Sequence, residues 1–157
     1  TVPELTALSV RADGRARLRG AFDAINLSLT AADEAEIDGD SIKAEQLRLQ
    51  VMNKADVDLE RLQVNDLEAT AFDRGSVELS GSAQTARLTN NGRSEMEAAD
   101  LRISHAQAAV NAKGDIELFA THSLKAHANG SGKIIYHGQP TLTRGGNVKK
   151  IQPAFDD

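Results

Sequence analysis

Acidic side chains recur along this chain at intervals of about twenty residues, and carboxylates in such a pattern could serve as cation ligands. Nine of them fall in five successive stretches: Glu36, Asp38, Asp56, Asp58, Glu78, Glu95, Glu97, Asp115 and Glu117. If these stretches stack on one another, the carboxylates form columns of like charge, which repel at strand spacing. One chemistry that would relieve this repulsion is calcium binding between carboxylates of adjacent turns.

A second way to relieve the repulsion is neutralisation by basic residues of the same repeat. Lys54, Arg74, Arg93 and Lys113 also recur at intervals of about twenty residues, just before the acidic positions. The sequence lacks the Asp-rich, Gly-rich nonapeptide loops of dedicated calcium solenoids. The favoured interpretation of the nine carboxylates is therefore a solvated, salt-bridged stripe, with cation or ligand binding as the alternative.

Other reactive constellations are missing from the sequence. It has no cysteine, which excludes disulfides and thiolate metal sites. Its four histidines, at 105, 122, 127 and 137, have different offsets within the repeat and are not expected to share a column. The chain has neither a Gly-x-Ser-x-Gly elbow nor a phosphate-binding loop. We therefore predict no catalytic, cofactor-binding or metal-binding residues, no cofactor and no enzymatic activity.

Composition narrows the class of protein further. The 18 basic and 23 acidic residues give a net charge of −5, which disfavours nucleic-acid binding. No apolar stretch is long enough to span a membrane, and the chain contains no signal segment. Apolar residues make up 40% of the chain but aromatic residues only 3%. Such a composition predicts a thin core lined with small side chains rather than a wide globular core.

Small residues mark a repeat of about twenty residues. They stand at Gly14, Ala35, Ala55, Gly75, Ser94, Gly114, Gly132 and Gly146. The position two residues after each is apolar throughout, as is the position six residues before each of the first seven. Apolar residues alternate with polar ones between these marks, which indicates two short strands per repeat separated by tight turns.

Each stretch resembles the stretch twenty residues later, which favours parallel stacking over an antiparallel meander. We therefore predict an all-β solenoid, a parallel β-helix of seven to eight rungs, forming one domain over 1–152 with a tail at 153–157. Ala16, Ala69 and Ala108 should point inward. The small turn residues should adopt positive φ or permit close approach between coils. Asn91, Asn111 and Asn129 should form a structural amide ladder.

The C-terminal third has a distinctive series of segments. Gly-Asp-Ile-Glu-Leu stands at 114–118, Asn-Gly-Ser-Gly-Lys-Ile at 129–134, Tyr-His-Gly-Gln-Pro at 136–140 and Gly-Gly-Asn-Val at 145–148. Together with the opening Val-Pro-Glu-Leu at 2–5, these segments resemble the bacterial putative auto-transporter adhesin, head GIN domain family. The resemblance implies a right-handed parallel β-helix and supplies no catalytic residues. Family domains usually begin with further strands, so the resemblance also implies that upstream strands are lacking here.

The resemblance implies an exported location, which is periplasmic, outer-membrane-associated or extracellular. The favoured function is a non-enzymatic, adhesin-like interaction module whose partner is an unknown protein or glycan. The alternative is a self-assembling envelope scaffold, a homo-oligomer formed through the faces or ends of the solenoid. A glycan-cleaving β-helix enzyme ranks below both, because such enzymes build a groove from long loops and the turns here are short.

Overall fold

The computed structural model describes the backbone of residues 8–10 and 14–154 and the side chains of 14–17 and 25–154. The segment 2–5, the direction of the Leu8 side chain and the last three residues of the predicted tail lie outside these ranges. The strands are β1 (Leu8–Val10), β2 (Arg15–Ala31), β3 (Glu36–Val51), β4 (Asp56–Ala71), β5 (Ser76–Asn90), β6 (Glu95–Val110), β7 (Asp115–Ala128), β8 (Ile134–His137), β9 (Thr141–Gly146) and β10 (Ile151–Pro153). One short 3-10 helix, η1, covers Val148–Lys150.

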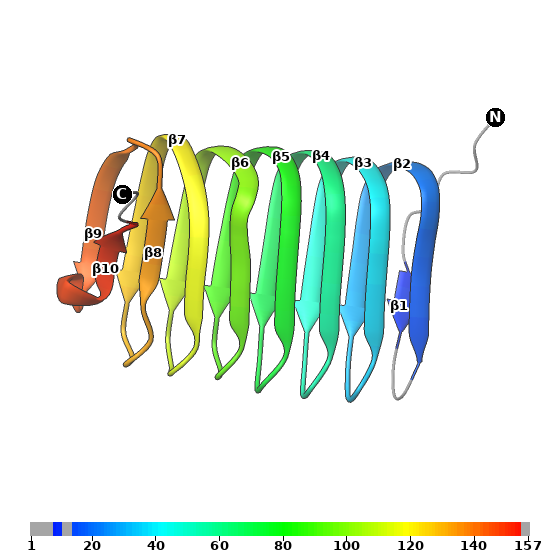
Figure 1. The fold of residues 1–157 in the computed structure, drawn as a ribbon, viewed down its shortest axis with the longest axis horizontal. Helices are drawn as coiled ribbons and strands as arrows, with labels where there is room; N and C mark the ends of the chain where they lie inside the picture. The colour runs from blue at the N-terminus through cyan, green and yellow to red at the C-terminus, as the bar shows by residue number, and fades with distance from the viewer. Residues whose placement is uncertain (1–7, 11–13, 155–157) are drawn as a thin grey trace.

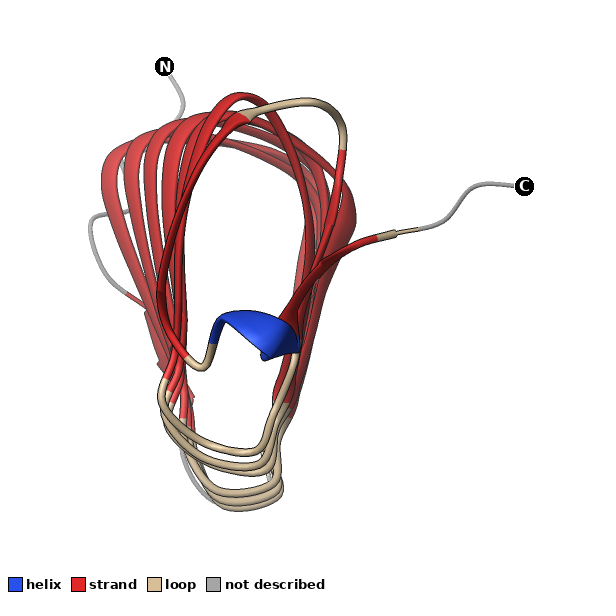
Figure 2. Cartoon of the chain, turned by 90° about the vertical axis from the view of Figure 1, so that its left-hand side faces the viewer, coloured by secondary structure: helices blue, strands red, loops and turns tan. Residues whose placement is uncertain are grey.

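Successive strands pair in parallel, each with the next along the chain. Their order is β1-β2-β3-β4-β5-β6-β7-β8-β10, and β9 pairs with β7. Figure 1 shows the strands β2 to β7 as a row of stacked turns, and Figure 2, along the axis, shows each turn as one closed ring. The chain is thus a β-solenoid of about 7 turns with about 20 residues per turn, which confirms the predicted fold class.

The long strands bend because inward and outward side chains do not alternate without interruption. In β3 two consecutive side chains face solvent at Asp40–Ser41 and again at Glu45–Gln46. Each such pair reverses the alternation, so the strand turns a corner while its apolar side chains stay inside. Each turn therefore has three outer faces, formed in β3 by residues 36–40, 41–45 and 46–51.

The interior is filled by columns of aliphatic side chains. One column consists of Leu29, Leu49, Ala69, Leu88, Ala108 and Ala126, none more than 3% exposed. None of the described buried residues is aromatic. Leucine and alanine side chains stacked at strand spacing fill the narrow interior of the solenoid without aromatic side chains. Ala69 and Ala108 point inward as predicted, whereas Ala16 is only half-buried because it lies near the N-terminal end of the stack.

Short loops at the narrow end of the ring join one turn to the next (Figure 2). The small residues here allow close approach between coils: a Cβ on Gly75 would lie 2.6 Å from the carbonyl oxygen of Ala55. Among the predicted small residues Gly146 has positive φ, at +70, whereas in the earlier loops positive φ falls two places before the small residue, at Asp33, Asn53 and Asp73. Asparagine and aspartate tolerate this conformation better than most residues. Both predicted roles of the small residues are therefore observed, close approach at Gly75 and positive φ at Gly146.

The predicted amide ladder is present in the later loops. Asn111 donates from Nδ2 to Asn91 Oδ1 at 2.6 Å, and Asn129 donates to Asn111 Oδ1 at 3.0 Å. A buried residue beside this ladder, Asn90, also donates to the carbonyl oxygen of Ser94 at 2.5 Å. These bonds satisfy polar groups of the loops that the strand ladder leaves unpaired.

The C-terminal end of the solenoid differs from the regular turns. Helix η1 lies across the mouth of the ring (Figure 2), and Ile151, at the start of β10, is buried against the core. Strand β10 pairs with β8 through Ile151 and Ile134. Within the described ranges, no helix has the length and apolar character needed to cross a bilayer.

Candidate functional site

The nine predicted carboxylates lie on the outer face formed in β3 by residues 36–40. Parallel register aligns Glu36, Asp56, Glu95 and Asp115 in one column, with Ser76 completing it, and Asp38, Asp58, Glu78, Glu97 and Glu117 in the next. We call this surface the acidic face. Its centre is a shallow depression of about 400 Å³.

Two further carboxylates, Glu60 and Asp100, border the acidic face beside Glu78 and Glu97. Glu60 follows the small residue of its repeat on the same strand as Asp56 and Asp58, without a change of register, so a comparison of sequence spacings could have revealed it. Asp100 pairs with Ser80 only because the register shifts between β5 and β6. That shift hides Asp100 from any fixed-spacing comparison of the sequence.

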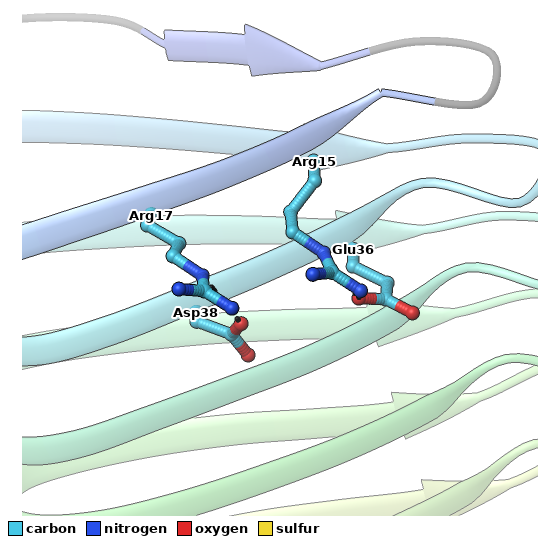
Figure 3. A network of polar contacts seen from close by, with 4 residues as sticks. All are labelled: Arg15, Arg17, Glu36 and Asp38. Atoms are coloured by element: carbon cyan, nitrogen blue, oxygen red, sulfur yellow. Dashed lines mark hydrogen bonds and ion pairs between the residues drawn. The ribbon is translucent and has the colours of Figure 1, made fainter.

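Basic partners are found at the two ends of the acidic face. Arg15 contacts Glu36 at 2.7 Å and Arg17 lies 3.9 Å from Asp38. Figure 3 shows how these two pairs lie. At the other end, His137 Nε2 lies 2.7 Å from Glu117 Oε1. Among the described residues, Asp58, Glu78 and the other central carboxylates form no ion pair within 4.0 Å.

The predicted neutralisation by a basic column is therefore wrong at the centre of the face. The side chains of Lys54, Arg74, Arg93 and Lys113 are exposed, and none of them forms an ion pair in the described part of the chain. They belong to the loops at the narrow end of the ring and not to the strands that hold the carboxylates. Whether the acidic face binds a cation stays a prediction, and no group of three or more potential metal ligands occurs among the described residues.

Two carboxyl groups at the centre respond to this crowding. Partial burial raises the pKa of Asp58, and the charges of Glu78, Glu60 and Asp38 raise it further. A hydrogen bond with Glu97 raises the pKa of Glu78, with burial and neighbouring charges adding to the effect. Because both folded-state pKa values lie above the ordinary ones, ionisation of these groups disfavours the folded state, and stability falls as pH rises through this range.

Neutralising the centre of the acidic face should stabilise the protein. We expect Asp58→Asn combined with Glu78→Gln to raise the free energy of unfolding by about 0.5–1 kcal/mol at neutral pH, since both side chains remain largely hydrated. Urea denaturation should show this gain shrinking as the pH is lowered toward 4.5, the ordinary glutamate pKa, and with added salt. The matched control, Asp66→Asn with Glu68→Gln, removes two carboxylates that have partners and should give no gain. Lower stability of the first variant at neutral pH would contradict the proposed repulsion.

A longer depression lies on another face and was not predicted. It is a groove of about 850 Å³ that runs along the solenoid beside residues 46–48 of β3 and their counterparts. We call it the long groove. Its outward side chains are Asn26, Ser28, Gln46, Arg48, Asp66, Glu68, Thr85, Arg87, His105, Gln107, Ser123, Lys125, Thr141 and Thr143. All are polar, so the groove offers hydrogen-bond donors and acceptors at every turn.

Contacts across the turns hold several of these side chains in place. The Thr85 hydroxyl donates to the Asp66 carboxylate, Arg48 lies 3.9 Å from Glu68, and His105 Nδ1 lies 2.8 Å from Ser123 Oγ. Among the described residues, no phenylalanine, tyrosine or tryptophan lines the groove. The sequence could have revealed it only as a set of outward offsets, because its residues share polarity but no residue type.

The four histidines have separate environments, with one exception. His137 pairs with Glu117 and stacks on Phe119, and His127 is exposed on β7. As expected from their offsets, His105 and His122 belong to different columns, since His105 pairs with Ser123. Their rings nevertheless meet at the corner between two faces, with centroids 5.5 Å apart.

The fold and its surfaces define a β-solenoid with a closed aliphatic interior and polar outer faces. More particularly, the chain belongs to the putative auto-transporter adhesin, head GIN domain family, whose model matches residues 1–140. The sequence resemblance to that family is thereby confirmed.

A solved structure gives the same fold. It is that of a protein from Parabacteroides distasonis named a putative lipid binding protein, with a TM-score of 0.90 and 22% sequence identity. The match covers 97% of this chain and 63% of that one, so this chain spans less than two thirds of its neighbour's length. At this identity the likeness shows the fold alone. Comparison with curated proteins gives no significant match.

Proposed function

We propose that this domain is a non-enzymatic, adhesin-like interaction module of the bacterial envelope or cell surface, and that it binds a glycan chain along the long groove. The carrying observation is the groove itself, which presents two columns of polar side chains over successive turns. A glycan chain is an extended polymer with hydroxyl groups along its length. Such a ligand matches a straight row of hydroxyl, amide and charged groups better than a compact ligand does.

The polarity of the described surface favours a polar ligand over an apolar one. Ile25 and Val148 are the large apolar side chains that are exposed among the described residues, and Ile25 borders a depression whose other lining residues are mostly polar. Protein interfaces usually have a desolvated apolar centre, which this surface does not offer in the described ranges. The name of the Parabacteroides neighbour suggests a lipid for that protein, whereas the described interior of this chain is occupied by packed leucine, isoleucine, valine and alanine side chains.

The alternative of a self-assembling scaffold finds less support. A solenoid that polymerises end to end needs open strand edges at both ends. At the C-terminal end, η1 crosses the ring and β10 covers β8, so regular stacking stops there. Lateral contacts through the faces would have to bury charged columns.

A glycan array followed by calorimetry with the best ligand tests the proposal. Arg87→Ser with Gln107→Ser truncates two neighbouring side chains of the long groove and should weaken binding at least about tenfold, which is about 1.4 kcal/mol. The matched control, Glu78→Ser with Glu97→Ser, truncates neighbouring side chains on the acidic face and should change affinity less than about twofold. Phospholipid vesicles and a peptide library form the other arms. Binding only to one of these, or equal affinity of the groove variant and the native protein, would overturn the proposal.

A further inference from the structure

Two histidines meet where the strand register is interrupted at a corner of the solenoid. Strands β6 and β7 pair through Ile103 and Ala120, and then through His105 and Ser123. Between these pairs β7 has one residue more than β6, so that it is bulged. Bulges redirect side chains and are frequent beside functional sites. The bulge presents His122 on the outside of the corner, where its ring lies 5.5 Å from that of His105 at an interplanar angle of 41°.

Hydrogen bonds determine which ring nitrogen of His122 has a lone pair free to bind a ligand. The Thr121 hydroxyl donates its proton to the carbonyl oxygen of Ile103 at 3.3 Å. The Thr121 oxygen also lies 2.9 Å from His122 Nδ1. When the hydroxyl proton is donated to Ile103, this oxygen accepts from the ring, and that pattern places the ring proton on Nδ1. The lone pair of the neutral ring is then on Nε2, the ring nitrogen that is not in contact with the Thr121 hydroxyl.

His105 is held in the same manner. Its Nδ1 lies 2.8 Å from Ser123 Oγ, which can accept a proton from the ring. Nε2 of His105 and Nε2 of His122 have no hydrogen-bond partner among the described residues. An imidazole whose Nδ1 is fixed by an oxygen and whose Nε2 is free has the usual arrangement of a metal-binding histidine.

The separation of the rings also suits a shared ion. Zinc and similar ions bind imidazole nitrogen at about 2.0–2.1 Å, which places the centres of two rings on one tetrahedral ion about 5 Å apart. The observed 5.5 Å requires only a small adjustment of exposed side chains. Oxygen-seeking ions such as calcium do not favour this pair, since both available donors are imidazole nitrogens.

We propose that His105 and His122 form a two-histidine site for a divalent transition-metal ion, with Cu²⁺ bound most tightly. The ranking follows from the general affinity order of nitrogen ligands for first-row ions. The described residues offer no third histidine or carboxylate at this corner, so water or a donor from a ligand completes the coordination. His105 also lines the long groove, and the metal would therefore lie at its edge.

Cu²⁺ titration of the full chain at neutral pH, followed by calorimetry and electron paramagnetic resonance, tests this site. We expect one Cu²⁺ per chain with a spectrum of two imidazole nitrogens. His105→Gln and His122→Gln should each weaken binding at least about tenfold and leave one nitrogen in the spectrum. His127→Gln, which removes an exposed histidine elsewhere on β7, should stay within about twofold of the native affinity.

A further variant tests the role of the Thr121 hydroxyl that contacts His122 Nδ1. Thr121→Val removes the acceptor at His122 Nδ1 and should weaken binding by a few fold, whereas Thr121→Ser should restore the native affinity. Thermal unfolding of the metal-free variants establishes that each is folded. Absence of Cu²⁺ binding, equal affinity of the native protein and both histidine variants, or a spectrum of oxygen ligands alone would overturn the proposal. None of these results depends on whether the long groove binds a glycan.

Discussion

Leu88→Asp is expected to lower the melting temperature by about 10 °C or more, or to prevent folding altogether. Leu88 is fully buried in β5 and stacks between Ala69 of the preceding turn and Ala108 of the following one. An aspartate there would place a carboxylate among aliphatic side chains with no partner, which costs more than about 4 kcal/mol. That cost is comparable to the whole free energy of unfolding of a typical domain, about 5–15 kcal/mol.

The neighbouring residue provides the control for this experiment. Arg87 precedes Leu88 on the same strand, but its side chain is exposed on the outer surface. Arg87→Asp should therefore change the free energy of unfolding by less than about 1 kcal/mol. Far-ultraviolet circular dichroism and thermal unfolding of the two variants provide the comparison. Equal tolerance of aspartate at 87 and 88 would mean that the assigned alternation of inward and outward residues in β5 is wrong.

The solenoid could be predicted because its physical basis is local and repeated. Alternation of apolar residues in segments such as Leu47, Leu49 and Val51 indicates a strand with one buried face, and recurrence after twenty residues indicates parallel stacking. The poverty of aromatic residues follows from the narrow ring, which Leu49 and Ala69 fill in adjacent turns. These properties depend on spacing alone, so the sequence contains them.

The surface could be predicted only in part, because sequence offsets do not specify where a side chain goes at a corner or in a loop. Asp58 and Glu78 could be placed in one column from their spacing. The basic loop residues Lys54 and Arg74 could not be excluded as their partners until the loops were seen to lie apart from the strands. The meeting of His105 and His122 depends on one additional residue in β7, which changes the register without leaving a pattern in the sequence.

Gly81→Ala is expected to be strongly destabilising, although it adds only a single methyl group. Gly81 lies opposite Leu62 in β4 and has φ +124, a conformation that side chains with a Cβ rarely adopt. A Cβ at this position would collide with the backbone nitrogen and carbonyl oxygen of Leu62. Backbone strain costs about 1–3 kcal/mol and the collision requires the two strands to separate, so we expect a total loss of about 3–5 kcal/mol.

Gly39→Ala distinguishes this effect from the general cost of a larger residue. A Cβ on Gly39 would lie 2.7 Å from Leu59 Cδ2 and 2.8 Å from Ile42 Cδ1, which are the ends of flexible side chains. Those side chains can move, and Gly39 has no positive φ, so the loss should be about 1 kcal/mol or less, partly offset by the lower entropy of the unfolded chain. Urea denaturation of both variants measures the difference. A larger loss for Gly39→Ala than for Gly81→Ala would imply that the close contact between β4 and β5 at Leu62 and Gly81 does not exist in the folded protein.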